Sequence, residues 1–166
     1  MCIRDSNSSI FGFKIFCLMT NKFTILGSGS SLGVPRIDGD FGKCNPNNQK
    51  NHRTRCCAHL KFNDISILID TSPDLRSQLL RNKIKDVDYV LYTHAHADQT
   101  HGINDLRAFY IKYRKRLNVY ADRLTKKHLM SSFGYCFKNK PGYPAILKMN
   151  LLVDVILLKK CMKVVS

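Results

Sequence analysis

A short apolar run that leads into a cluster of histidines constrains this chain more than any other stretch. The run covers residues 89–92 and is followed by Thr-His-Ala-His-Ala-Asp-Gln-Thr-His-Gly at residues 93–102. Because side chains alternate in direction along a strand, we expect His94, His96 and Asp98 to share one side at the strand's exit. Imidazole and carboxylate groups are ligands that zinc, iron and manganese prefer. The stretch therefore predicts a metal site. A polar loop with incidental histidines is the weaker alternative, since three of the chain's six histidines fall here.

The length and the charge of the chain narrow the classes of function. A chain of 166 residues is long enough for one domain with a core and too short for two large ones. The net charge of +15 is compatible with polyanionic partners such as phosphate esters or nucleic acid. The competing explanation for this positive charge is a biased overall composition with lysines scattered along the chain. No stretch reaches transmembrane length, so we expect no membrane partner.

The cysteines indicate the cellular compartment of the protein, and residues 1–18 bear on where its domain begins. Seven cysteines form no CxxC pair and no framework spacing, which predicts reduced thiols in a cytoplasmic protein. Residues 1–18 contain a short apolar stretch that is interrupted by charge and lacks a small-residue cleavage site. We therefore treat residues 1–18 as an uninformative extension and residues 19–166 as the domain.

The hydrophobic pattern predicts an α/β chain. Asn63-Asp64 is expected to form a hairpin turn, and Ser72-Pro73 is expected to start a helix as its N-cap and first residue. Paired strands, a capped helix and then alternating strands and helices favour an α/β (α+β) sandwich over a doubly wound sheet. We predict strands at 23–26, 58–62, 65–70, 89–92 and 117–121 and within 146–158, helices ending near 82 and at 102–113 and 125–132, and loops at 37–51 and 134–144.

A Gly/Ser-rich loop follows the first predicted strand. Its sequence, GSGSSLGVPR at residues 27–36, could cradle a phosphate through backbone N–H groups. It matches neither of the common nucleotide-binding patterns. Tight packing of the loop beside another site explains the glycines equally well, so both explanations stay open.

Several of these segments together resemble the metallo-β-lactamase superfamily. The resemblance rests on the HxHxD motif after an apolar strand, on GSGSSLGVPR and on ILIDTSPD at residues 67–74, and it extends from about Lys22 to about Pro144. Within the superfamily, GVPR, RTR at 53–55 and THGINDLR at 100–107 are similar to the branch of ribonuclease Z-like and phosphoribosyl 1,2-cyclic phosphate phosphodiesterase-like hydrolases. The resemblance implies a metallo-β-lactamase-like αββα fold.

The resemblance also implies roles for individual residues. His94 and His96 look like ligands of a first metal, and Asp98 looks like a ligand of a second metal and a catalytic group that steers the attacking hydroxide. Asp70 resembles the acid that orients a ligand histidine; a structural aspartate beside the following helix is the alternative. The implied cofactor is Zn²⁺, two ions per complete site, with Mn²⁺ or Fe²⁺ as alternatives.

The chain departs from the superfamily pattern in two places. The residue after the motif's aspartate is usually a metal-binding histidine, and here it is Gln99; His101, two residues later, is expected to take its place. The superfamily also uses a further His, Asp and His downstream, and neither His128 nor Asp154 stands in a matching context. We therefore expect the N-terminal part of a longer enzyme, with the C-terminal half of the fold incomplete and no turnover by this part alone.

The function implied by the resemblance is metal-dependent hydrolysis of a phosphodiester, with a small cyclic phosphodiester as the candidate substrate. Arg53 and Arg55 are expected to bind its phosphate, because guanidinium groups match phosphate oxygens; a solvated loop is the alternative for both. A tRNA 3′-processing endonuclease and a catalytically incomplete metal-binding fragment are the competing functions. Nucleic acid remains a candidate partner, and the chain is compatible with a homodimer.

Overall fold

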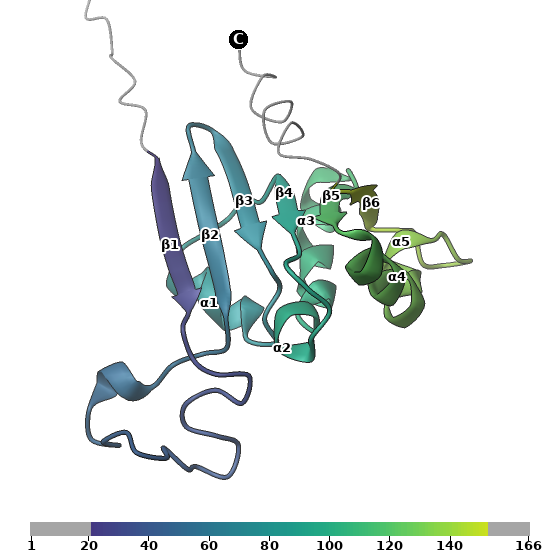
Figure 1. The fold of residues 1–166 in the computed structure, drawn as a ribbon. Helices are drawn as coiled ribbons and strands as arrows, with labels where there is room; N and C mark the ends of the chain where they lie inside the picture. The colour runs from purple at the N-terminus through teal and green to yellow at the C-terminus, as the bar shows by residue number, and fades with distance from the viewer. Residues whose placement is uncertain (1–20, 153–166) are drawn as a thin grey trace, which may run out of the picture.

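The computed structural model describes residues 21–152. These residues form one six-stranded sheet whose spatial order is the order of the strands along the chain (Figure 1). The strands pair antiparallel from β1 to β3 and parallel from β3 to β6. They are β1 (Lys22–Gly27), β2 (Cys57–Phe62), β3 (Ile65–Ile69), β4 (Tyr89–Leu91), β5 (Leu117–Ala121) and β6 (Leu147–Leu151).

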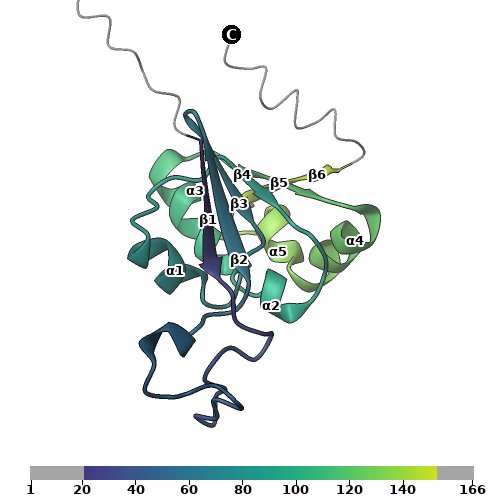
Figure 2. The same ribbon diagram turned by 60° about the vertical axis from the view of Figure 1, so that its left-hand side comes forward.

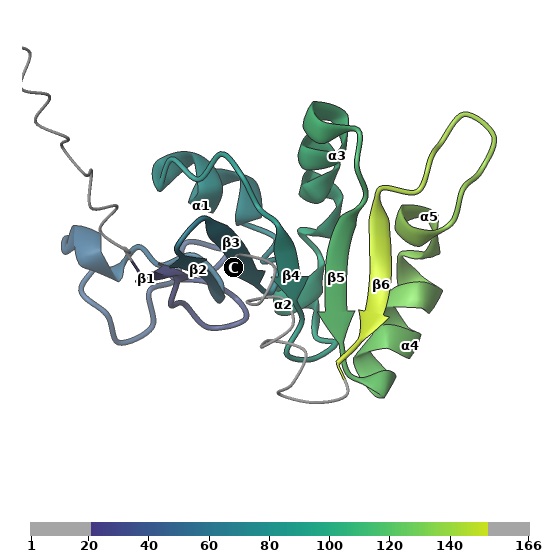
Figure 3. The same ribbon diagram turned by 90° about the horizontal axis from the view of Figure 1, so that it is seen from above.

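Helices form each crossover between the parallel strands, which is the usual way to connect them. Figure 3 shows α1 and α3 on one side of the strands, and α4 and α5 beside β6. The helical elements are α1 (Leu75–Arg81), α2 (Ala97–Thr100), α3 (Arg107–Tyr113), α4 (Arg123–Ser132) and α5 (Gly134–Phe137), with 3₁₀ turns η1 (Gln49–Asn51) and η2 (Ile103–Leu106).

One hydrophobic core joins the helices to the inner face of the sheet. Alternate strand residues such as Leu68, Val90 and Val119 are fully buried, because strand side chains alternate between the two faces. Leu75 of α1 and Leu129 of α4 are fully buried in the same cluster. The predicted α/β class is therefore confirmed.

The other face of the sheet is more open at its β1 edge. Phe23 and Ile25 are 59% and 66% exposed, although both lie in a strand. Their outward direction follows from the period-2 alternation, since Leu26 points into the core. Residues 21–152 thus comprise one sheet and one helical layer of the expected αββα arrangement.

The predicted hairpin is confirmed. β2 and β3 pair from Phe62 opposite Ile65, which leaves Asn63 and Asp64 as the turn. Asn63 has a φ of 51°, and asparagine tolerates this left-handed conformation better than most residues that carry a Cβ. The missing glycine in this turn is thus replaced by the residue type next best suited to it.

Three element predictions need correction. The first helix begins at Leu75, not at Pro73, because Ser72 first makes a turn in which its carbonyl accepts the N–H of Leu75 at 2.9 Å. β4 ends at Leu91, one residue earlier than expected, and α2 begins at Ala97 after His96, its N-cap in an extended conformation. The predicted loop at 134–144 contains α5, whose Cys136 is buried in the core.

The ends of several strands meet at one end of the sheet, which we call its site edge, and the histidine loop lies there. β3 and β4 are parallel and both end there, and β2 begins there because it is antiparallel to β3. The long connection from β1 to β2 extends from this edge, on the same side as α2 (Figures 1 and 2). The site is therefore assembled from the loops at this edge.

Two predictions fall wholly or partly outside residues 21–152: the extension at 1–18, and the continuation of strand structure from 153 to 158. No described helix is both long and apolar enough to cross a lipid bilayer.

Candidate metal centre at the histidine loop

The candidate centre begins with a hydrogen-bonded link between the ends of β3 and β4. The Asp70 carboxylate accepts the backbone N–H of Thr93 at 2.8 Å and its hydroxyl at 2.7 Å. Asp70 holds a left-handed backbone conformation, with a φ of 62°. Its own N–H donates to the carbonyl of Leu91 at 2.8 Å. The two strand ends are thus fixed to each other immediately before the histidines.

The Thr93 hydroxyl also contacts the ring of the next residue, His94. Thr93 Oγ1 lies 3.0 Å from His94 Nδ1. An ionised carboxylate has no proton to donate, so the Thr93 hydroxyl donates its proton to Asp70. The hydroxyl oxygen is then the acceptor toward His94, and His94 donates from its Nδ1–H. This assigns the proton of His94 to Nδ1 and leaves the lone pair on Nε2, the state that a metal ligand needs.

His94 and His96 are brought together by the extended chain between them. His94 Nε2 lies 3.1 Å from His96 Nδ1, and the ring centroids are 4.6 Å apart. Both side chains are exposed. Two adjacent imidazole nitrogens at an open edge fit two of the ligands that a divalent metal uses.

Two opposing effects of its surroundings act on the pKa of Asp70. Burial raises the pKa of the Asp70 carboxyl, while the hydrogen bonds from the N–H and the hydroxyl of Thr93 lower it. Only 7% of Asp70 is exposed. The two Thr93 hydrogen bonds therefore stabilise a buried carboxylate that would otherwise lose its solvation without compensation.

Asp98 lies in the first turn of α2 rather than in an extended strand. Its Oδ2 accepts a hydrogen bond from Gln99 Nε2 at 2.9 Å. Gln99 is buried, and its Oε1 is a buried oxygen with no hydrogen-bond partner in the described part of the chain. Strand alternation does not extend to Asp98, because the chain turns helical at Ala97, and the role of Asp98 beside His94 and His96 stays a prediction.

His101 follows the end of α2. Its Nδ1 lies 3.2 Å from Thr100 Oγ1, and its ring meets Phe133 edge-on at 5.4 Å between centroids. Thr100 Oγ1 donates its own proton to the carbonyl of His96 at 2.9 Å. His101 is exposed, and its role as a ligand stays a prediction.

Within residues 21–152, no three His, Cys, Asp or Glu side chains converge closely enough to hold a metal ion. The pair of His94 and His96 is the converged part of the predicted set. Asp98 and His101 are held by their own neighbours in α2. The residues present therefore fit part of a ligand set and not a whole one.

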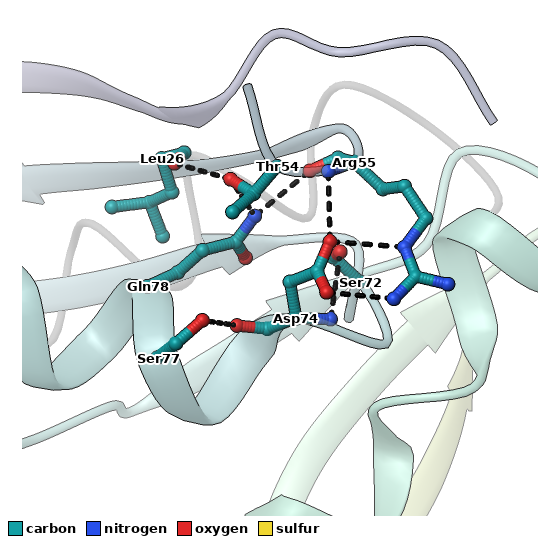
Figure 4. Close-up of polar contacts among 7 residues, drawn as sticks. All are labelled: Leu26, Thr54, Arg55, Ser72, Asp74, Ser77 and Gln78. Carbon is teal, nitrogen blue, oxygen red and sulfur yellow. Dashed lines mark hydrogen bonds and ion pairs between the residues drawn. The ribbon is translucent and has the colours of Figure 1, made fainter. Parts of the chain in front are cut away.

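The two predicted phosphate-binding arginines have different surroundings. Arg55 forms an ion pair with Asp74, with Nε 2.9 Å from Oδ2 and Nη2 2.6 Å from Oδ1, and its backbone N–H also donates to Oδ2 (Figure 4). The hydrogen bond from Arg55 lowers the pKa of Asp74. Arg53 is exposed and donates from Nε to the carbonyl of Lys50 at 3.3 Å. Arg55 is thus committed to a structural pair, while the Nη atoms of Arg53 remain at the surface.

The Arg55–Asp74 pair sits in a network that joins three segments of the chain. Gln78 of α1 donates from Nε2 to Thr54 Oγ1 at 2.9 Å and to the carbonyl of Arg55 at 2.8 Å. Thr54 Oγ1 donates to the carbonyl of Leu26 in β1 at 3.2 Å. Figure 4 shows this network linking β1, α1 and the segment before β2.

Two glycines are required by close backbone contacts. A Cβ on Gly27 would lie 2.0 Å from the carbonyl oxygen of Arg55, and one on Gly102 would lie 2.0 Å from that of Ser72. Tight packing therefore accounts for Gly27 at the start of the Gly/Ser loop. Gly102 lets the histidine loop pack directly against Ser72.

Thr93 is the site residue that the sequence analysis missed. Its position immediately before the first histidine, at the end of an apolar strand, was the available signal. A hydroxyl there can link the histidine's Nδ1 to a neighbouring strand end. The Asp74 partner of Arg55 was also missed, since the two are 19 positions apart in the sequence.

The sequence matches a known family over about half of its length. The matched family is described as the Beta-lactamase superfamily domain, and the match covers residues 66–154. A protein of Porphyromonas gingivalis named octanoyltransferase is 38% identical over 122 residues, which are 72% of this chain and 24% of that protein.

Solved structures resemble the fold. A diphosphatase of the PhnP family is 34% identical, with a TM-score of 0.69, over 80% of this chain and 50% of its own. Zn²⁺-bound PqqB from Methylobacterium extorquens is 18% identical, with a TM-score of 0.53, over 80% of this chain and 46% of its own. Human tRNase Z, short form, is 14% identical, with a TM-score of 0.52, over 80% of this chain and 44% of its own. The chain spans about half the length of these solved structures and about a quarter of the Porphyromonas protein.

Proposed function

Because the chain belongs to the metallo-beta-lactamase superfamily, we propose that it carries metal-binding residues of a hydrolase that cleaves a phosphodiester. The observation that carries the proposal is the chain of hydrogen bonds from Asp70 through Thr93 to His94, which puts the proton of His94 on Nδ1 and its lone pair on Nε2, 3.1 Å from His96 Nδ1. The similarity to a diphosphatase, at 34% identity, supports a substrate with phosphate linkages. A small cyclic phosphodiester is the substrate we propose to test first.

His94 and His96 would hold the metal, and we propose Zn²⁺, with Mn²⁺ and Fe²⁺ as alternatives to be separated by metal analysis. Zn²⁺ in PqqB, a protein of the same fold, supports this choice. The chemistry that a divalent metal would supply there is a lowered pKa of bound water and neutralisation of charge on the phosphoryl oxygens. A complete site of two ions would need ligands beyond the converged pair of histidines.

The proposed tasks of the other residues follow from their contacts. Thr93 keeps the His94 ring oriented, and Asp70 keeps Thr93 in place. Gln99 fixes Asp98 Oδ2, which leaves Oδ1 of Asp98 to orient the attacking water or to bind metal. His101 is proposed as the ligand that replaces the histidine expected at position 99.

Arg53 is the better candidate of the two arginines for binding the substrate phosphate. Its Nη atoms can donate to phosphate oxygens in a bidentate arrangement. Arg55 donates both its Nε and one Nη to Asp74 and is proposed to position the loop that carries Arg53.

A tRNA 3′-processing activity is the second candidate, and the net charge of +15 is the observation that favours it. Salt-sensitive binding of tRNA would support it, because phosphate contacts release counterions. No binding of tRNA at low salt would exclude it.

We propose a cytoplasmic location, supported by the thiol state of the described cysteines. Cys44, Cys56, Cys57 and Cys136 are free thiols, as is typical of reducing compartments.

Two measurements test the proposed function. Zn²⁺ binding is measured by competition with a chromophoric chelator, and hydrolysis is measured with bis(4-nitrophenyl) phosphate in the presence of Zn²⁺ or Mn²⁺. We expect His96→Ala to abolish Zn²⁺ binding and any hydrolysis, and we expect His128→Ala, at an exposed position of α4, to change neither. Equal metal binding by His96→Ala and the unsubstituted chain would overturn the proposal.

The stoichiometry separates the competing functions. Two ions per chain support a complete catalytic site, and one ion supports a partial site that needs further ligands. No bound ion would support the non-catalytic alternative.

A further inference from the structure

A second group of cationic side chains surrounds a buried histidine at the end of the sheet opposite the histidine loop. His59 lies on the inner face of β2, and Ser66 lies near the start of β3, whereas Asp70 follows the end of that strand. A cavity of about 260 Å³ opens here. Its charged lining consists of Lys22, Lys61, Lys83, Lys85 and Asp86, together with His59. We call this cavity the lysine pocket.

Three of the lysines occupy positions that cost stability. Lys22 of β1 lies directly opposite Lys61 of β2, and like charges in that arrangement repel. Lys83 has a φ of 55° just after α1, a left-handed position where glycine is favoured. Such costs are retained where the residues serve another purpose.

The lysine charges have no acidic partner in the described part of the chain. The ion pairs formed by residues 21–152 do not involve Lys22, Lys61, Lys83 or Lys85. Lys61 Nζ donates to a backbone carbonyl, that of Asp64, at 2.6 Å. Asp86, the one acid in the lining, accepts Lys112 Nζ at 2.6 Å and the Tyr113 hydroxyl. The pocket therefore carries an uncompensated positive charge.

The hydrogen bonds of His59 leave one ring nitrogen available. Ser66 Oγ donates its proton to the carbonyl of Asp86 at 2.6 Å, so it accepts the Nε2–H of His59 at 2.7 Å. His59 Nδ1 then carries a lone pair, and residues 21–152 provide it with no hydrogen-bond partner. Only 7% of the residue is exposed. A protonated His59 would present an Nδ1–H as a donor inside a positive pocket.

We propose that the lysine pocket binds a small oxyanion of the phosphate class, free or as the phosphate of an ester, with protonated His59 donating to it from Nδ1 while its Nε2–H stays on Ser66 Oγ. An anion of this class carries enough charge to offset several ammonium groups and accepts several hydrogen bonds at once. The cavity volume leaves room for a phosphate with a small attached group. The site is separate from the histidine loop and does not depend on the proposed hydrolase function.

Anion binding should be coupled to protonation of His59. In the structure, burial together with the charges of Lys61 and Lys22 lowers the pKa of His59. The charged groups of the lining are Lys22 on β1, Lys61 on β2, and Lys83, Lys85 and Asp86 after α1, and Asp88 lies behind Ser66, whose backbone N–H it accepts at 2.8 Å. A bound dianion reverses the sign of the local field, so it should raise the pKa of His59 and bind more tightly as the pH falls.

The test follows the ring resonances of His59 by NMR while inorganic pyrophosphate is added, with AMP as the ester in a second titration. We expect saturable shifts and an increase of about one unit in the pKa of His59. Stronger binding of pyrophosphate would identify a free anion as the ligand class, and stronger binding of AMP would identify an ester.

Matched variants distinguish a site from general attraction to a basic surface. Lys61→Gln should weaken binding by about tenfold, in line with the loss of one charge-assisted contact. Lys127→Gln, at an exposed position of α4, should leave it unchanged. His96→Ala should also leave the His59 response unchanged, which separates this pocket from the candidate metal centre. The proposal is overturned if His59 does not respond at millimolar pyrophosphate, or if Lys127→Gln weakens binding as much as Lys61→Gln.

Discussion

Asp70 holds Thr93 by two hydrogen bonds, one from its backbone N–H at 2.8 Å and one from its hydroxyl at 2.7 Å. The first ties the end of β4 to the end of β3, and the second fixes the proton of the hydroxyl. Because that proton points to the carboxylate, the hydroxyl oxygen accepts the Nδ1–H of His94, and the lone pair of His94 lies on Nε2, which faces His96 Nδ1. A single buried acid thus determines both the backbone path and the ring nitrogen of His94 that points to the Thr93 hydroxyl.

Removal of the Thr93 hydroxyl should weaken metal binding without unfolding the protein. Thr93→Val keeps the shape and the backbone N–H bond to Asp70 but loses the link to His94. We expect a loss of about 10–100-fold in Zn²⁺ affinity, as is usual when the group behind a ligand histidine is removed. Chelator competition measures the affinity. Thr93→Ser is the control and should retain it; equal weakening by both variants would contradict the hydroxyl's role.

The Arg55–Asp74 pair should make stability depend on pH in the acid range. The hydrogen bond from Arg55 lowers the pKa of Asp74 below its unfolded value. Its contribution is therefore complete above the unfolded pKa of about 3.9 and is lost as the pH falls through the lower, folded pKa. Urea unfolding at a series of pH values measures this loss.

Arg55→Gln supplies the comparison for that measurement. It should remove the part of the acid-range loss due to Asp74 and destabilise the protein by about 1–2 kcal/mol near neutral pH, since the pair is partly buried. An unchanged profile in the variant would show that other carboxyl groups cause the acid sensitivity.

Gly102 should tolerate no side chain. Its Cβ would lie 2.0 Å from the carbonyl oxygen of Ser72, and both segments are fixed by neighbouring backbone hydrogen bonds. We expect Gly102→Ala to cost about 3 kcal/mol of unfolding free energy, the upper end of the range typical of overpacking, because the contact is with backbone. Thermal melting measures it. Gly134→Ala, where nothing lies within 4 Å of the new Cβ, should change stability little.

The adjacent cysteines should differ sharply in reactivity. Burial raises the pKa of Cys57 to about 12, while the neighbouring Cys56 is exposed. Since the thiolate is the nucleophile, iodoacetamide at pH 8 should label Cys56 and spare Cys57 in the folded protein. Mass spectrometry of the peptides checks this. Labelling of Cys57 at the rate of Cys56 would mean that the start of β2 opens readily.

The sequence was sufficient to predict the elements that depend on local pattern. The hydrophobic pattern predicted the limits of strands β1 to β5 to within two residues. The Asn63-Asp64 turn predicted which residues of β2 and β3 pair in the hairpin. The position of Asp98 could not be read in this way. A strand exit and a helix start both suit Ala-Asp-Gln-Thr, and hydrogen bonds such as that from Thr100 Oγ1 to the carbonyl of His96 decide for the helix.

Contacts between distant segments account for the rest of what the sequence missed. The pairing of Arg55 with Asp74 and the link from Asp70 to Thr93 each join residues that only the fold brings together. The pattern of residues showed which side chains are suited to a site, but it could not show which of them are occupied by a structural partner. Arg55 is such a case, and its predicted role in substrate binding stays a prediction.

The agreement between spatial and sequence order in the sheet has a consequence for how the protein is made. Every strand from β2 to β6 pairs with the strand that precedes it in the chain. During synthesis, each strand that leaves the ribosome therefore finds its partner already present, and no pairing waits for a later strand. Contacts between neighbours in sequence also favour rapid folding. The sheet of residues 21–152 is thus suited to growth strand by strand from its N-terminal edge.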